Sequence, residues 1–275
     1  FHDLDVLAVG KAASEAGSAF DLYWNSRHAV PVGVLHDKPL DITDLDIMRT
    51  ELEMNLDEAL AEVPYKVPHD IELVRTQLEQ LASELTWAET EIIVDPLDRF
   101  DGDEESAFVV LGRTLRQEAS EDLTMQTAYL IPNGGGLGNI EHLTDKGVRV
   151  RIMTNSALSN NHLAVHAHYM KYRKPLIQAG VELYELRADA ELLDHYRETD
   201  NRIADSHAGL HTKAFVVDGH ISVIGSYNMD PRSRIWNSEI ALLIRSEEFG
   251  DIVLAEMEEE FEPGNAYRVE LDERG

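Results

Sequence analysis

Short apolar segments alternate with longer segments of helical periodicity along most of this chain, and this alternation restricts the fold more than any other sequence feature. Apolar runs rich in β-branched residues predict strands at 5–9, 91–94, 125–131, 148–154, 181–186, 212–217, 221–225 and 239–244. Helical spacing predicts helices at 11–24, 43–61, 71–85, 104–121, 139–146, 163–179 and 247–261. We therefore expect an α/β fold in which helices flank both faces of a mixed sheet.

Two segments depart from this alternation. Residues 36–86 are acidic, have helical periodicity and contain no strand pattern, which is typical of a helical insertion or a helical cap on the sheet. The dipeptide Asp218-Gly219 joins the strand segments 212–217 and 221–225 directly. An Asp-Gly pair between two apolar runs predicts a β-hairpin with a tight turn.

The composition limits the chemistry and the partners. The 275 residues carry a formal net charge of −28, which repels nucleic acid and anionic lipid at low salt and is typical of a well-solvated surface or of a saline habitat. The window 146–181 contains no acidic residue. Two explanations are open. The window either forms a surface that faces an anion, or it forms a strand and a helix that lack acidic residues because they are buried. There is no cysteine, which excludes disulfides and cysteine nucleophiles, and no run long enough to cross a bilayer.

The segment His211-Thr-Lys213 combines two side chains suited to phosphate chemistry. Residues two apart on a strand project from the same face, so the imidazole and the ammonium should share one surface. An imidazole acts as a nucleophile or general acid near neutral pH, and a neighbouring cation stabilises charge on a phosphoryl oxygen. A lone His-x-Lys is more often a surface pair, so the prediction depends on the residues that follow.

Four later residues would complete a phosphate pocket. Gly225 and Ser226 end the strand 221–225, where a small residue and a hydroxyl let backbone N–H groups approach a phosphate. Asn228 would donate its amide to the same group. Glu239 would accept a hydrogen bond from an imidazole nitrogen and fix its tautomer. Together these residues predict one phosphate pocket.

The pattern His-x-Lys, four residues, Asp218, six residues, Gly-Ser-x-Asn and a later Glu resembles the second signature motif of the phospholipase D superfamily. The segments 147–156, 165–173 and 179–186, with 3–7 and 20–26 near the start, resemble its bacterial cardiolipin synthase C-like branch. The stretches 125–132 and 36–86 depart from that branch, so the resemblance is weaker for residues on the substrate side than for the motif.

This resemblance implies a mechanism. Two halves of a pseudo-dimeric α/β fold each give one such motif to a shared cleft. One histidine attacks phosphorus to form a phosphohistidine, and the other protonates the leaving alcohol, with no metal or other cofactor. Because the first-motif histidine of two-motif relatives often makes the attack, the resemblance favours His211 as general acid and leaves a nucleophilic role open.

The resemblance also assigns roles to the other residues of the motif. The phosphate would be bound by Lys213, Ser226 and Asn228. Lys213 and Glu239 would act with His211 in catalysis, Glu239 by orienting an imidazole. Asp218 and Gly225 would support the strands rather than react.

Only one copy of the motif is present in the chain. We expect the other upstream, so that 1–35 is the tail of a first phospholipase D-like half, 36–86 the helical insertion or cap, and 87–275 the second half. A homodimer pairing two copies of His211 is the alternative.

The function expected from the resemblance is a phosphatidyltransferase or phospholipase that acts on anionic glycerophospholipid, with cardiolipin synthesis as the main expectation. It would lie at the cytoplasmic membrane of a bacterium, or in the cytoplasm. A phosphodiesterase or nuclease of the same superfamily is one alternative, although the charge counts against nucleic acid as a partner. The other is a non-catalytic fragment that retains the phosphate pocket.

Several other residues have both a functional and a structural interpretation. The spacing of His162, His166 and His168 would suit a metal, but packing near the cleft is the stronger interpretation because the window 146–181 lacks carboxylates. Asp95 and Asp98 flank Pro96 and predict a strand-ending turn rather than paired catalytic carboxylates. The run 134–136 is a flexible glycine loop or an anion cradle at a helix N-terminus. The two tryptophans at 24 and 236 belong to the core or to a ligand pocket.

Overall fold

The structure, a computed structural model, describes residues 2–35, 42–62, 71–102, 104–194, 198 and 206–272. The chain divides into two compact units. The first contains the sheet and comprises Phe1–Ala19 and Trp87–Gly275, and the second is helical and comprises Phe20–Thr86. Of the predicted helical segment 36–86, residues 36–41 and 63–70 lie outside the described residues.

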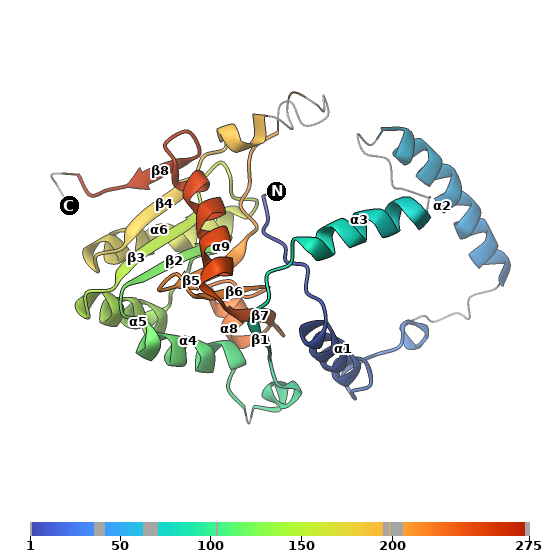
Figure 1. The fold of residues 1–275 in the computed structure, drawn as a ribbon, viewed down its shortest axis with the longest axis horizontal. Coiled ribbons are helices and arrows are strands. Elements are labelled where there is room, and N and C mark those ends of the chain that lie inside the picture. Colours follow the sequence, from blue (N-terminus) through green and yellow to red (C-terminus); the bar gives the residue numbers. More distant parts are fainter. Residues whose placement is uncertain are drawn as a thin grey trace. The chain divides into compact units, whose positions relative to one another are not determined.

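Eight strands form one mixed sheet in the first unit (Figure 1). Their order across the sheet is β1-β7-β6-β5-β2-β3-β4-β8. β2, β3 and β4 run parallel to one another, and all other neighbouring strands are antiparallel. The strands are β1 (Glu89–Val94), β2 (Asp122–Thr127), β3 (Arg149–Asn155), β4 (Glu182–Leu186), β5 (Lys213–Val217), β6 (Ile221–Gly225), β7 (Ile240–Arg245) and β8 (Ala266–Val269).

Helices cover both faces of this sheet. α4 (Ala107–Glu118), α5 (Gly134–Asp145) and α6 (Leu163–Gln178) contribute to one core, which includes Ile152 of β3. α9 (Glu247–Phe261) contributes to a second core, which includes the adjacent Met153, and Figure 1 shows it in red across the sheet. Because successive strand residues point to opposite faces, the two cores lie on opposite sides. The predicted α/β fold with a mixed sheet flanked on both faces is confirmed.

The predicted hairpin is also confirmed. β5 and β6 pair in antiparallel register, with Val217 opposite Ile221. The intervening Asp218 and Gly219 have φ angles of 49° and 68°. Two successive residues with positive φ are the requirement of the tight hairpin turn that Asp-Gly favours.

One predicted strand is absent from the sheet, and one strand of the sheet was not predicted. The segment 5–9 is extended and alternates exposed and half-buried residues, but it pairs with no strand and is therefore not part of the sheet. Leu4, Val6 and Ala8 pack against the body of the unit instead. β8 was not predicted from the sequence. It is a four-residue strand, Ala-Tyr-Arg-Val, that pairs only with β4 and has two exposed central residues.

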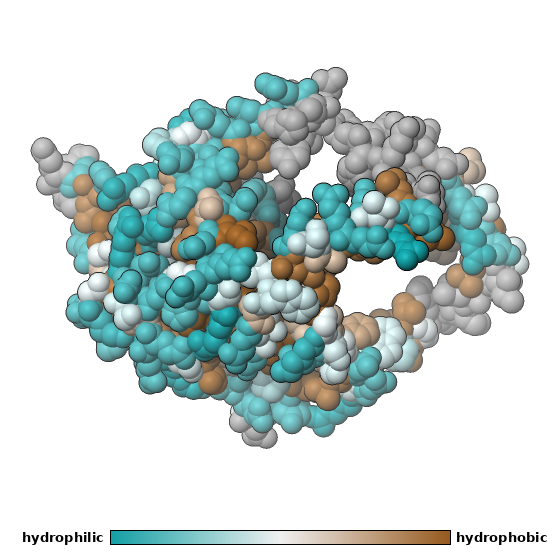
Figure 2. Space-filling view, in the orientation of Figure 1, coloured by the Kyte–Doolittle hydropathy of each residue, from teal (hydrophilic) through white to brown (hydrophobic). Residues whose placement is uncertain are grey.

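The second unit contains the C-terminal end of α1 (Lys11–Trp24), together with η1 (Val32–Val34), α2 (Ile42–Glu62) and α3 (Ile71–Ser83). Large hydrophobic side chains are exposed on α2 and α3, among them Leu52, Met54, Ile71 and Leu78. Figure 2 shows brown, hydrophobic patches over these helices. None of the helices in the described part of the chain is long and apolar enough to cross a membrane.

Candidate active site

The residues expected in the phosphate site lie together at one end of the strands, along the border of the sheet that holds the carboxyl ends of the parallel strands. The parallel strands β2 and β3 end there, and β5 begins there because it runs antiparallel to β2. Lys213, the first residue of β5, lies opposite Thr127, the last residue of β2. Gly225 ends β6 at the same edge and lies opposite Ala241 of β7. Ligands of open α/β sheets commonly bind at the carboxyl ends of the parallel strands.

His211 lies just before β5 and is bound by a carboxylate from the start of the chain. Its Nδ1 lies 2.6 Å from Oδ2 of Asp3, and the two side chains are 49% and 41% exposed. This contact gives Nδ1 the proton and fixes the imidazole tautomer. Sequence reasoning did not identify Asp3, because the contact joins residues 208 positions apart.

The segment that carries Asp3 is held by its backbone and by His2. The N–H of His2 donates to the carbonyl of Gly209, and the N–H of His211 donates to the carbonyl of His2, both at 2.7 Å. Nε2 of His2 lies 2.9 Å from a carboxylate oxygen of Glu260 on α9. The hydrogen bond to Glu260 raises the pKa of His2 above its usual value, although burial opposes the shift.

A buried asparagine fixes the chain directly before His211. Asn155, at the end of β3, donates its side-chain amide to the carbonyl of Leu210 and accepts the N–H of Leu210, both at 2.8 Å. The same amide donates to the carbonyl of Ala128 at 3.0 Å. Asn155 lies in the segment 147–156, which carries part of the family resemblance, but nothing in its spacing connects it with His211.

Lys213 lies half-buried beside this pair. Its ammonium donates to the carbonyl oxygen of His211. Burial lowers the pKa of Lys213, and the nearby carboxylates of Asp3 and Glu239 oppose that shift. Both carboxylates are therefore close enough to act on this cation, and a cation partly removed from water interacts strongly with anions.

Asn228 is 7% exposed and presents its amide nitrogen to the site. Its Oδ1 accepts hydrogen bonds from the backbone N–H of Tyr129 at 3.3 Å and from the hydroxyl of Thr127 at 3.4 Å. Because a backbone N–H can only donate, the atom facing Tyr129 must be the oxygen. The remaining Nδ2 donates to no described residue, so its N–H groups are available to an acceptor.

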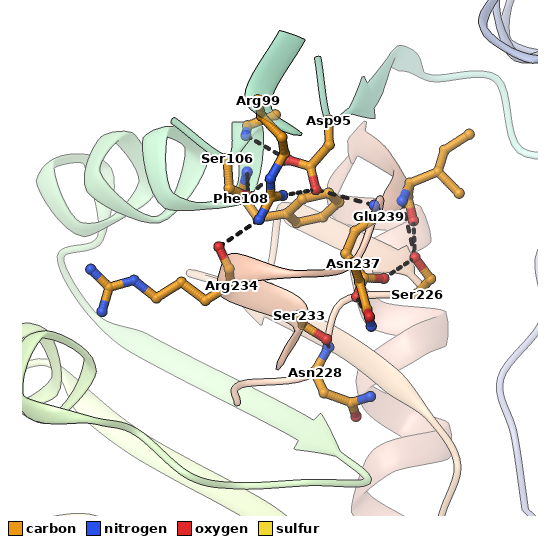
Figure 3. Close-up of polar contacts among 12 residues, drawn as sticks. Asp95, Arg99, Ser106, Phe108, Ser226, Asn228, Ser233, Arg234, Asn237 and Glu239 are labelled. Atoms are coloured by element: carbon orange, nitrogen blue, oxygen red, sulfur yellow. Dashed lines mark hydrogen bonds and ion pairs between the residues drawn. The ribbon is translucent and has the colours of Figure 1, made fainter. Parts of the chain in front are cut away.

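Glu239 is 4% exposed and lies in a network of short polar contacts (Figure 3). Its carboxylate accepts from the hydroxyl of Ser226 and, at 3.0 Å, from the amide of Asn237. No imidazole of the described residues contacts it. Ser226 also accepts the N–H of Ile240 at 3.0 Å, so both the hydroxyl and the carboxylate have protein partners in this structure.

Asp95 anchors the backbone of Glu239. Its carboxylate accepts the N–H of Glu239 at 3.1 Å, the hydroxyl of Ser106 at 2.8 Å and the N–H of Ala107 at 2.8 Å, and it forms an ion pair with Arg99. The predicted turn after β1 is present as η2 (Leu97–Asp101). Sequence reasoning missed the contact with Glu239, which lies 144 residues away.

Gly225 and Asp218 have different local roles. A Cβ on Gly225 would lie 2.3 Å from the carbonyl oxygen of Ile240, so a glycine is needed because β7 passes close by, and its φ is not positive. The N–H of Ser226 donates to that same carbonyl rather than facing an open pocket. Asp218 accepts four hydrogen bonds of 2.8–2.9 Å from Ser120, Glu121 and Asp122, which fasten the hairpin to the start of β2.

Comparison with known proteins decides the family. The family model described as "Cardiolipin synthase, PLD-like domain" matches residues 113–263. The chain belongs to this family. It is 29% identical over 256 residues to cardiolipin synthase C of Escherichia coli K12, covering 92% of this chain and 53% of that protein. It is 30% identical over 142 residues to cardiolipin synthase A of Klebsiella pneumoniae, covering 52% of this chain and 25% of that protein.

The phospholipase D-like chain spans about half the length of cardiolipin synthase C. Among solved structures, Nuc from Salmonella typhimurium, a phospholipase D family member, aligns with 66% of this chain and 100% of its own. The TM-score of that alignment is 0.47 and the identity is 18%.

The acid-free window of this phospholipase D-like chain does not form an open basic face. Arg149 pairs with Glu182, Arg151 with Glu258, and Arg173 with Glu185. Lys146 donates to the carbonyls of Arg116 and Ala119. Four of the six basic side chains in the window are thus bound to neighbouring elements. The interpretation based on buried elements holds for β3, which is buried except at Arg149, whereas only three residues of α6 are buried.

The other candidate residues have structural positions. His166 is buried, and its pKa is lowered by burial and by Arg173, whereas His162 and His168 are exposed. No group of three or more potential ligand side chains capable of holding a metal occurs in the described part of the chain. Trp24 and Trp236 are exposed rather than in the core. Asn133 precedes α5 without capping it through its side chain.

Proposed function

We propose that this chain supplies one half of a phosphodiester-transfer site that acts on glycerophospholipids. The observation that supports this most is the contact of His211 with Asp3 beside a partly desolvated cation, Lys213. The amide nitrogen of Asn228 lies at the same sheet edge and lacks a partner among the described residues. An imidazole with a fixed tautomer, a cation and an amide donor are what a reacting phosphate group requires.

In the proposed reaction an imidazole nitrogen attacks phosphorus. A nitrogen–phosphorus bond forms, the bond from phosphorus to the leaving alcohol breaks, and a second imidazole gives that oxygen its proton. The imidazole that lost the proton then takes one from the incoming alcohol or water. The oxygen of that molecule attacks phosphorus, the nitrogen–phosphorus bond breaks, and the first imidazole is released. Lys213 and Asn228 hold the non-bridging oxygens throughout, and metal chemistry is not required by these steps.

We assign His211 the general-acid role. The Asp3 carboxylate binds Nδ1 and orients the ring, which leaves Nε2 as the nitrogen that gives the proton to the leaving alcohol. Glu239 would orient the other imidazole. No imidazole of the described residues contacts Glu239. That second histidine would come from a first-motif half joined to this chain or from a second copy of it.

We propose an anionic glycerophospholipid as the substrate, with cardiolipin formation as the transfer reaction, because the relatives with the broadest coverage include cardiolipin synthase C. The site would work at the surface of a bacterial membrane. The net charge of −28 repels nucleic acid and anionic lipid alike, so the choice of a lipid substrate rests on the relatives.

The first test measures hydrolysis of a chromogenic phosphodiester over a range of concentrations of this chain. His211→Ala is the inactive variant, and His168→Ala, a change of an exposed histidine on α6, is its matched control. Activity that rises faster than linearly with protein and disappears only in His211→Ala supports a site shared by two copies.

The second test uses a protein in which this chain is joined to a first-motif half. On vesicles of phosphatidylglycerol it should release glycerol and form cardiolipin, and His211→Ala should abolish both. Absence of both products, together with cleavage of DNA that depends on His211, would replace the lipid proposal with a nuclease.

A further inference from the structure

A cavity of about 360 Å³ lies between α4, α5 and the sheet. Its walls are apolar and come from both helices and from the strands, with Leu111 and Leu115 on α4, Ile140 and Leu143 on α5, and Met125 on β2. Sites for small ligands commonly have volumes of roughly 300–1,000 Å³ and are lined mainly by apolar side chains. The cavity is thus large enough for a ligand and is suited to an apolar one.

The charged residues that line the cavity are exposed or half-buried, which places them at its rim. They are three arginines and two carboxylates, and Arg113 pairs with Glu105. Asp230 accepts the N–H of Ser233, and Arg116 and Arg234 form no ion pair within the described residues. They donate instead to Asn139 and Asn133. Nε of Arg116 is buried and has no hydrogen-bond partner among the described residues. Unpaired cations in so acidic a chain favour a ligand with an anionic end.

One end of the cavity adjoins the proposed phosphate site. Thr127 lines the cavity and also donates to Oδ1 of Asn228. Tyr227 and Met229, the neighbours of Asn228 in the sequence, line it as well. Tyr227 stacks on Phe108 of α4 with ring centroids 4.8 Å apart. A molecule with its phosphate at Asn228 would therefore have an apolar chamber within reach.

We propose that this cavity receives one fatty acyl chain of the lipid whose phosphate reacts at His211. The inference rests on the proposed function, and it adds a binding site for the tail. The apolar walls exclude a sugar or a nucleobase, whose polar groups would be left without partners. The cations at the rim match the negative charge that a phospholipid carries beside its tails.

The test measures binding of alkyl phosphates to this chain, in competition with a fluorescent fatty acid and below the concentration at which either forms micelles. Hexyl, octyl and decyl phosphate form the series. Burial of each methylene should lower the Kd by about fourfold. His211→Ala should leave this chain-length dependence unchanged, because the tail does not touch the imidazole.

Two glycines provide a matched pair of variants. Gly112 of α4 lines the cavity and Gly138 of α5 does not, and a Cβ at either position meets nothing within 4 Å. Gly112→Phe should remove most of the chain-length dependence, and Gly138→Phe should retain it. Val109→Phe, at another lining residue, should act as Gly112→Phe does. Circular dichroism checks that all three variants fold.

The outcomes separate this inference from the proposed function. Equal Kd values along the series, or equal effects of Gly112→Phe and Gly138→Phe, would overturn the acyl site even if His211-dependent hydrolysis is present. A chain-length dependence that only the cavity variants remove supports the acyl site, whether or not the chromogenic diester is hydrolysed.

Discussion

The buried ion pair between Asp95 and Arg99 should make Asp95→Asn one of the most destabilising conservative changes in this chain. The side chains of Arg99 and Asp95 are 4% and 0% exposed. The variant keeps the shape of the side chain but leaves the guanidinium buried without its carboxylate. Breaking a buried pair from one side costs about 3–5 kcal/mol. An amide oxygen can still accept from Ser106 and Ala107, so we expect the lower end, about 3 kcal/mol.

Urea unfolding followed by circular dichroism measures this change. For a slope of about 3 kcal/mol per molar urea, the midpoint should fall by about 1 M. Arg99→Met in the same background removes the unpaired cation, so the double variant should be more stable than the sum of the two single changes by at least about 1 kcal/mol. A loss below about 1 kcal/mol for Asp95→Asn, or two additive single changes, would refute the reasoning.

Three other changes test separate parts of the structure. Gly225→Ala should cost about 3 kcal/mol or more in a urea titration, because its Cβ would overlap the β7 backbone, whereas Gly112→Ala should be neutral or stabilising. Burial raises the pKa of Asp218, but its hydrogen bonds to the start of β2 lower the pKa further, so the net shift is downward. The stability that the Asp218 carboxylate contributes is therefore present above about pH 4 and is lost as the pH falls through the lower pKa of the folded state. Asp218→Asn should therefore cost roughly 1–3 kcal/mol at pH 7, and less in acid unfolding experiments. The raised pKa of His2 gives the opposite sign: the stability advantage over His2→Ala should be complete below about pH 6.5 and disappear as the pH rises through the folded pKa.

The sequence predicted those parts of the fold that depend on local pattern. The hairpin at Asp218-Gly219 and the helix Lys11–Trp24 have the predicted positions, because turn chemistry and helical periodicity act over a few residues. The segment 5–9 has the alternation of a strand but lacks a neighbouring strand with which to pair. The strand order across the sheet and β8 depend on contacts between distant segments, which one sequence does not contain.

The same distinction holds for the site. Lys213 and Asn228 could be proposed from the sequence because they lie within one compact motif. Asp3, Asn155 and Asp95 were missed because each acts on the site across 55 to 208 residues of chain. Gly225 was identified for ligand approach, but the close passage of Ile240 is a sufficient reason for a glycine there.

The two carboxylates near Lys213 are held in unequal ways, and this has a consequence for the chemistry. Glu239 is buried and fixed through its backbone by Asp95 and through its side chain by Ser226. Asp3 is 41% exposed and follows His2, whose side chain anchors the segment by its contact with Glu260. That contact raises the pKa of His2. Loss of the proton from His2 weakens that anchor and therefore the position of the carboxylate that orients His211. The imidazole proposed as general acid thus depends on a second imidazole, and activity that depends on His211 should weaken as the pH rises through the folded pKa of His2.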